Sequence, residues 1–127
     1  MKVYSPILKK NLFSLVQGFC DKDENPLNAI KREILEETGI KVIKKNIKYL
    51  NKILPMHSLI NSKLAIYFTN LKKLNLYDLK KRKKEIGTGK IYFYNFKQIK
   101  KMLKKPYIFD LISYATISYY FITNKIV

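Results

Sequence analysis

Three glutamates lie close together in the chain, at positions 33, 36 and 37. Neighbouring carboxylates repel one another, and without a positive partner one of them is driven towards protonation. A hard cation such as Mg2+ removes that repulsion, because it binds carboxylate oxygens and keeps other positions for water and phosphate oxygens. Glu33, Glu36 and Glu37 therefore predict a divalent-cation site that can lie beside a phosphate group.

The glutamates fall on a segment that carries the start and stop signals of a helix. Asn25 is a favourable N-cap, and Pro26 is tolerated at the first helical position because its missing N–H would have no partner there. Gly39 supplies the left-handed residue that commonly follows the last helical position. These signals predict a helix from Pro26 to about Thr38.

The periodicity of this helix separates an apolar face from an acidic one. At 100° per residue three aliphatic side chains gather on one face, which predicts a stripe towards the core. They are Leu27, Ile30 and Ile34. Glu33 and Glu37 lie one turn apart, and Glu36 lies on the same side.

Arg32 lies four residues before Glu36 and is expected to pair with it or with Glu24 across the preceding loop. Its planar fork of donors suits the orientation of a carboxylate, so we interpret it as a supporting residue. A charged segment of this kind is most often only a solvated helix face. Here, however, the acidic residues interrupt a lysine-rich chain, and Gly18 and Glu24 precede them at a defined spacing.

That spacing follows the long pattern G-x5-E-x7-R-E-U-x-E-E-x-G-U, in which U is a bulky aliphatic residue. Every specified position is met, by Gly18, Glu24, Arg32, Glu33, Ile34, Glu36, Glu37, Gly39 and Ile40. The segment therefore resembles the Nudix box. The resemblance implies an α/β (α+β) fold, an α/β/α sandwich in which helices flank a mixed sheet. It also implies hydrolysis of a nucleoside diphosphate linked to another group, with Mg2+ or Mn2+ as cofactor.

The resemblance also assigns roles to the residues of the box. Metal binding is implied for Glu33, Glu36 and Glu37, together with the backbone carbonyl of Gln17. A mainly structural role is implied for Gly18, Glu24, Arg32 and Gly39.

The order of segments after the box resembles the ADP-ribose pyrophosphatase branch of the family. We expect strands at residues 64–68 and 91–94, a helix at residues 96–103 and a last helix starting near Phe109. The resemblance implies ADP-ribose, NADH or diadenosine polyphosphates as substrates, with AMP released by attack of water on phosphorus.

The carboxylate that accepts the proton of that water is expected to be Glu36, Glu37 or Glu85. In the resembling branch a glutamate in the loop of Glu85 is a candidate general base or further metal ligand. The alternative is that Glu85 only neutralises the lysines around it, in the segment KKRKKEIGTGK. His57, the only histidine, is interpreted as a surface residue and is left out of the catalytic set.

The box glycine stands unusually early, at position 18. The residues before it suffice for one strand or a hairpin arm, such as residues 11–16. We therefore expect the first strands of the family's sheet to be missing, which puts substrate affinity and dimer formation in doubt. An exposed sheet edge would favour association, so a homodimer is a candidate state.

The formal net charge of +17, from 26 Lys and Arg against 9 Asp and Glu, allows two interpretations. A strongly basic protein can bind nucleic acid. An AT-rich coding sequence also raises Lys, Ile, Asn and Tyr together, and we favour this compositional origin. The basic run at residues 80–84 lacks the interleaved aromatic residues of a base-stacking surface.

Composition sets the remaining expectations. A chain of 127 residues that is 47% apolar predicts a single domain over residues 1–127. A single cysteine, Cys20, excludes an internal disulfide, and with no secretory signal it favours the cytoplasm and no membrane association. Two alternatives to an active pyrophosphatase stay open: a basic RNA-binding module or RNA 5′-end-processing relative, and a folded but inactive remnant.

Overall fold

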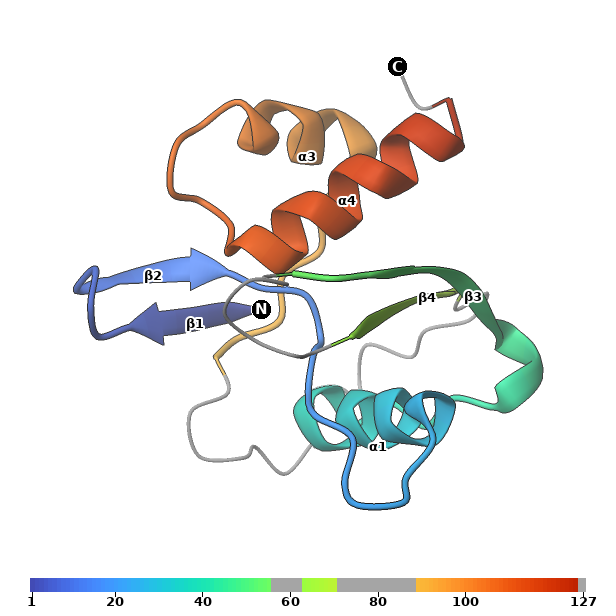
Figure 1. Cartoon of the computed structure of the whole chain (residues 1–127). Coiled ribbons are helices and arrows are strands. Elements are labelled where there is room, and N and C mark those ends of the chain that lie inside the picture. Colours follow the sequence, from blue (N-terminus) through green and yellow to red (C-terminus); the bar gives the residue numbers. More distant parts are fainter. Residues whose placement is uncertain (56–62, 71–88, 126–127) are drawn as a thin grey trace. The chain divides into compact units, whose positions relative to one another are not determined.

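The computed structural model describes residues 1–55, 63–70 and 89–125, which form two compact units (Figure 1). The first unit combines residues 1–15 with residues 89–125, and the second comprises residues 16–55 and 63–70. Antiparallel strand pairs and helices occur in both, which confirms the predicted α+β class.

A hairpin begins the first unit. Strand β1 (Lys2–Ser5) pairs with β2 (Lys10–Phe13) in antiparallel register, from Lys2 opposite Phe13 to Ser5 opposite Lys10. The turn between them contains Lys9 with a positive φ of 49°. The residues before the box thus hold two paired strands, and β2 begins one residue before the expected hairpin arm.

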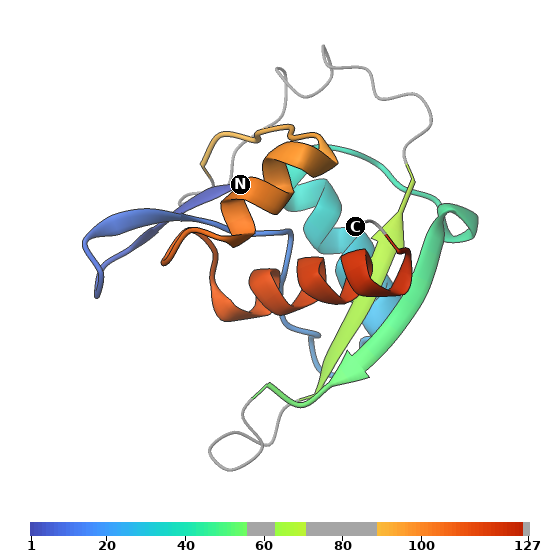
Figure 2. The same cartoon turned by 90° about the horizontal axis from the view of Figure 1, so that it is seen from above.

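Two helices complete the first unit, and both are anticipated from local signals. Helix α3 (Phe96–Leu103) has the predicted bounds, because Asn95 and Gln98 form a reciprocal capping box at its start. Helix α4 (Leu111–Thr123) begins slightly later than predicted, since the Asp110 side chain caps it by accepting from the Ser113 backbone N–H. The α3–α4 loop returns to the hairpin, where Phe13 bridges to Phe109 in parallel (Figure 2).

The predicted strand at residues 91–94 is wrong. The described segment has no regular strand pairing there. Its rings pack on the hairpin instead, with Tyr92 and Tyr94 edge-on to Phe13 at centroid distances of 5.5 and 5.6 Å. The aromatic residues that favoured a strand therefore serve side-chain packing rather than a hydrogen-bonded ladder.

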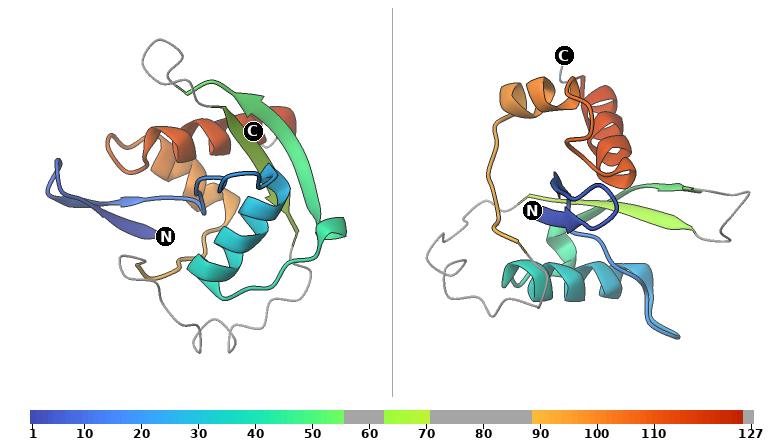
Figure 3. Two further views of the ribbon diagram at one scale, coloured as in Figure 1. Left: turned by 60° about the horizontal axis from the view of Figure 1, so that its bottom comes forward. Right: turned by 90° about the vertical axis from the view of Figure 1, so that its left-hand side faces the viewer.

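The second unit places one helix along one face of a strand pair (Figure 3). Helix α1 (Pro26–Thr38) is followed by a short 3-10 turn, η1 (Lys44–Asn46), and by β3 (Ile47–Ile53). Strand β3, whose bounds the sequence did not indicate, pairs antiparallel with β4 (Leu64–Thr69), as predicted for residues 64–68.

Small and aliphatic side chains are the ones buried in this second unit. The buried apolar residues are Ala29, Ile34, Val42 and Ile66. Of the predicted helix stripe, Ile34 is buried, while Leu27 and Ile30 are half-buried. The fully covered line along α1 runs instead through Ala29, Ile34 and Thr38.

Candidate active site

The helix that carries the three glutamates is closed at both ends as predicted. The Asn25 side chain accepts from the Asn28 backbone N–H at 2.9 Å, with Pro26 at the first helical position. Gly39 adopts φ 70°, and its N–H donates to the Leu35 carbonyl at 2.7 Å. Left-handed backbone costs glycine little, which explains its place in the box.

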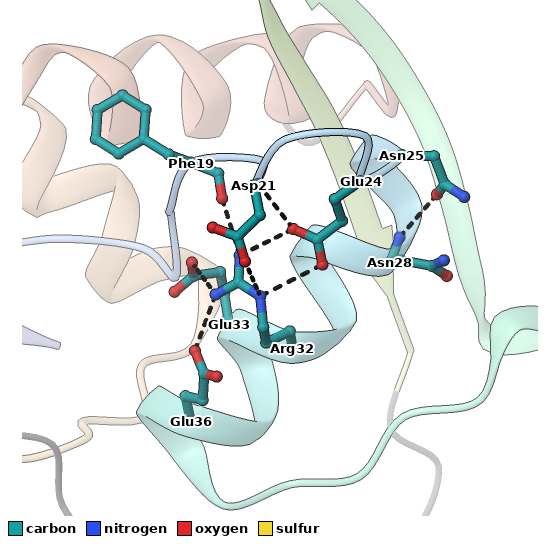
Figure 4. Close-up of polar contacts among 8 residues, drawn as sticks. All are labelled: Phe19, Asp21, Glu24, Asn25, Asn28, Arg32, Glu33 and Glu36. Carbon is teal, nitrogen blue, oxygen red and sulfur yellow. Dashed lines mark hydrogen bonds and ion pairs between the residues drawn. The ribbon is translucent and has the colours of Figure 1, made fainter.

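Arg32 is the hub of the polar network on α1 (Figure 4). Its Nη1 donates to Glu33 Oε1 at 2.8 Å and to Glu36 Oε2 at 3.0 Å. Its Nη2 donates to Glu24 Oε2 at 3.0 Å and to the Phe19 carbonyl at 2.9 Å. The predicted pairing was an alternative, Glu36 or Glu24, and the structure shows both together with Glu33.

This network has a clear electrostatic effect. The hydrogen bond with Glu24, followed by that with Glu33, raises the pKa of Arg32 above its ordinary value. The hydrogen bond from Arg32, followed by that from the Asp21 backbone, lowers the pKa of Glu24. Both groups are therefore charged throughout the neutral range.

Glu24 also organises the loop before the helix. Its carboxylate accepts from the Asp21 N–H at 3.1 Å, and its own N–H donates to the Asp21 carbonyl at 3.0 Å. Asp23 completes this turn with φ 64°. Since Arg32 binds both Glu24 and the Phe19 carbonyl, one side chain ties the loop to α1. The part played by Phe19 was missed, because any residue offers a backbone carbonyl and the sequence carries no signal for it.

Gly18 and Glu33 are in direct contact across this loop. A Cβ atom at position 18 would lie 2.0 Å from Glu33 Cδ and 2.0 Å from its Oε1. No side chain fits there unless the Glu33 carboxylate moves. Gly18 therefore provides room for a glutamate of the predicted metal-ligand set.

The glutamate side chains offer the kind of oxygen ligands that a divalent cation binds. Glu33 and Glu36 converge on a single positively charged nitrogen, and hard divalent cations take the same carboxylate oxygens. Oε2 of Glu37 and Oε1 of Gln17 are shielded from solvent. Across the described residues, however, no three His, Cys, Asp or Glu side chains are already grouped to hold a metal ion, and Glu33 and Glu36 bind Arg32.

Three features named from the sequence lie outside the described residues. Glu85, the candidate general base, falls in residues 71–88, and His57 falls in residues 56–62. The basic run at residues 80–84 lies outside as well.

A comparison with protein families matches residues 5–104 of this chain to the NUDIX domain. The chain belongs to the Nudix family. The match includes the whole box and the Arg32 network, and it extends across residues of both compact units. Nudix enzymes generally use divalent metal ions, which agrees with the predicted cofactor class.

A relative from Buchnera aphidicola (subspecies Acyrthosiphon pisum, strain APS), named 8-oxo-dGTP diphosphatase, is 41% identical over 66 residues. The aligned part covers 51% of this chain and 49% of that protein, so the chain spans about half the length of its curated relative. No solved structure matches the chain.

The family match and this relative support the predicted Nudix pyrophosphohydrolase. They do not support the narrower resemblance to the ADP-ribose branch, because the relative is named for a different nucleotide. Among the described residues, no helix is long and apolar enough to cross a membrane.

Proposed function

We propose that this Nudix protein hydrolyses the pyrophosphate linkage of a nucleotide with the help of Mg2+ or Mn2+. The observation that carries the proposal is the convergence of Glu33 and Glu36 on one positive group beside Gly18. Such a convergence of carboxylates is what a hard cation requires when it also binds phosphate oxygens.

The box residues divide into binding and supporting roles in this proposal. Glu33, Glu36 and Glu37, with the carbonyl of Gln17, would hold the cation. When bound, the cation supplies charge neutralisation at the phosphate oxygens and lowers the pKa of a coordinated water. Arg32 would keep Glu24 and the Phe19 carbonyl in place, so that the loop stays attached to α1.

A carboxylate must then accept the proton of the attacking water. Glu36, Glu37 and Glu85 are the candidates, because each is a carboxylate in or after the box. Gly18 leaves room for the Glu33 side chain and Gly39 ends the helix, and neither contacts the reacting groups in the proposal.

The name of the B. aphidicola relative favours a nucleoside triphosphate of the 8-oxo-dGTP kind as substrate. ADP-ribose, NADH and diadenosine polyphosphates form the competing class that the sequence resemblance implied. A homodimer and a cytoplasmic location stay predictions.

The decisive experiment measures nucleoside monophosphate release from 8-oxo-dGTP, dGTP, ADP-ribose, NADH and diadenosine triphosphate, with Mg2+ or Mn2+. Glu37→Gln should lower the rate by about 10²- to 10⁴-fold without unfolding the protein. Asp23→Asn is the control, since Asp23 is an exposed acid of the loop that precedes α1. Folded wild-type protein that releases no monophosphate from any of these substrates would refute the proposal.

A further inference from the structure

Positive charge is unevenly distributed between the two units. Residues 1–15 and 89–125 hold ten lysines and a single acidic residue, Asp110. Residues 16–55 and 63–70 hold nine basic and six acidic residues. A compositional excess of lysine alone does not explain why acids are so scarce in one unit.

The single acid of the first unit is already engaged. Asp110 accepts from the Ser113 backbone N–H at 2.9 Å and from Ser113 Oγ at 2.7 Å. It serves as the N-cap of α4, and no ion pair joins it to a lysine among the described residues. The lysines of this unit are therefore available to an anionic partner.

Two of these lysines lie over aromatic rings. Lys10 Nζ is 4.4 Å from the centroid of Tyr107, and Lys2 Nζ is 5.3 Å from that of Tyr92. Lys10 and Tyr107 are far apart in sequence and meet because residues 107–109 return to β2. The interleaving of basic and aromatic side chains that is absent from the run at residues 80–84 is thus created by folding.

Tyr107 is the most exposed ring of the two pairs. It keeps 70% of its surface in contact with solvent, and its φ is 55°. A bulky residue rarely adopts this backbone conformation, which costs free energy. Lys104 and Lys105 precede it in the α3–α4 loop, and the ammonium group of Lys10 lies over the ring.

We propose that the Lys10–Tyr107 pair forms a binding site for single-stranded nucleic acid on this unit. A base would stack on the exposed ring of Tyr107, while Lys10 and its neighbours bind the phosphate backbone. Every base has a π-face, so this surface recognises single strands with little sequence preference.

An anionic membrane surface fits these observations less well. Membrane binding by a basic helix requires a free apolar face. The apolar side of α3 is used within the unit, where Phe96 contacts Phe121 at 5.7 Å and Tyr120 at 6.4 Å between ring centroids. The exposed residues of α3 are mostly polar, namely Lys97, Gln98, Lys100 and Lys101, and Phe96 is the one apolar residue among them, at 54% exposure.

The test is fluorescence anisotropy of labelled oligouridine with the full chain over a series of salt concentrations. Tyr107→Leu keeps the apolar side chain and the same backbone demand but removes the ring. It should weaken binding by about 5- to 30-fold. Tyr107→Phe should restore binding, and Lys10→Gln should reduce the salt slope by about 0.7.

Matched controls separate this surface from general charge. Lys44→Gln removes an exposed lysine of the second unit, and Tyr4→Leu removes a ring that is 57% exposed on β1 and has none of the described lysines over it. Both should bind like wild type. Equal weakening by Lys44→Gln and Lys10→Gln, or no effect of Tyr107→Leu, would overturn the proposal.

Two further measurements do not depend on the folding of a variant. Photocrosslinking of wild type to 4-thiouridine oligonucleotides should label the peptide that contains Tyr107, and labels confined to other peptides would contradict the assignment. Binding to phosphatidylserine vesicles without binding to oligouridine would replace nucleic acid with a membrane surface.

Discussion

The carboxyl group of Glu33 lies directly against the Cα of Gly18, in the space that any larger residue would fill with its Cβ. Gly18 does not have the positive φ that would explain a glycine by backbone conformation, whereas Gly39 does. The two glycines of the box therefore serve different purposes. Gly39 permits a left-handed backbone, and Gly18 leaves room for a glutamate.

Gly18→Ala should weaken metal binding more than it weakens the fold. The added Cβ must displace Glu33, but only the end of a flexible side chain has to move. We expect Mn2+ affinity, measured by titration calorimetry, to fall by about 10-fold or more. Thermal unfolding should change little. Unchanged Mn2+ affinity would remove Glu33 from the proposed ligand set.

Gly89→Ala should have the opposite consequence. A Cβ there would lie 1.9 Å from the Lys2 carbonyl oxygen and 2.9 Å from its carbon, so it collides with the backbone of β1. We expect a loss of about 1–3 kcal/mol in the free energy of unfolding, measured with urea. Wild-type stability in this variant would mean that β1 does not lie against Gly89 in solution.

Glu24→Gln should make stability less dependent on pH. Arg32 lowers the pKa of Glu24 below its ordinary value of 4.5, so the ionised group stabilises the fold above that pH. This contribution is lost as the pH falls through the lowered pKa. The variant should therefore unfold more easily than wild type at neutral pH, with the difference disappearing in acid.

Urea titrations at several pH values measure the difference in unfolding free energy between wild type and Glu24→Gln, which should shrink as the pH falls. Asp23→Asn is the control at neutral pH, because Asp23 is exposed and makes no ion pair with the described residues. A Glu24→Gln deficit of equal size at every pH would argue for lost packing rather than lost charge.

Ser113→Ala should destabilise the first unit. Ser113 is fully buried, accepts from the Leu15 N–H at 2.9 Å and donates to Asp110. Its removal leaves the Leu15 N–H without this acceptor, which costs about 1–3 kcal/mol. Ser118→Ala on the same helix is the control. Equal unfolding free energies for the two variants would show that the Ser113 bridge contributes nothing.

The two predicted helices with reliable bounds, Pro26–Thr38 and Phe96–Leu103, were foreseeable because caps and periodicity are local. Asn25, Gly39 and Asn95 cap residues within four positions of themselves, so the helix ends can be predicted from the local sequence. The box glutamates were identifiable for the same reason, as were Arg32 and its partners within one turn.

The missed features all depend on contacts between distant residues. The segment at 91–94 has the composition of a strand, but its rings pack against Phe13 and its backbone forms no strand pairing. Strand β3 contains lysine and asparagine, and its pairing depends on β4 rather than on its own propensity.

The sequence by itself determined the Nudix box, the capped helix that carries it and the excess of positive charge. Only the tertiary structure decided that Glu33 rests on Gly18, that the Phe19 carbonyl binds Arg32, and that Lys10 lies over Tyr107. The physical reason is that a cap acts over a few residues, whereas these contacts form when the chain closes a loop. Loop closure costs conformational entropy that many weak interactions offset together, so no single residue in the sequence predicts these contacts.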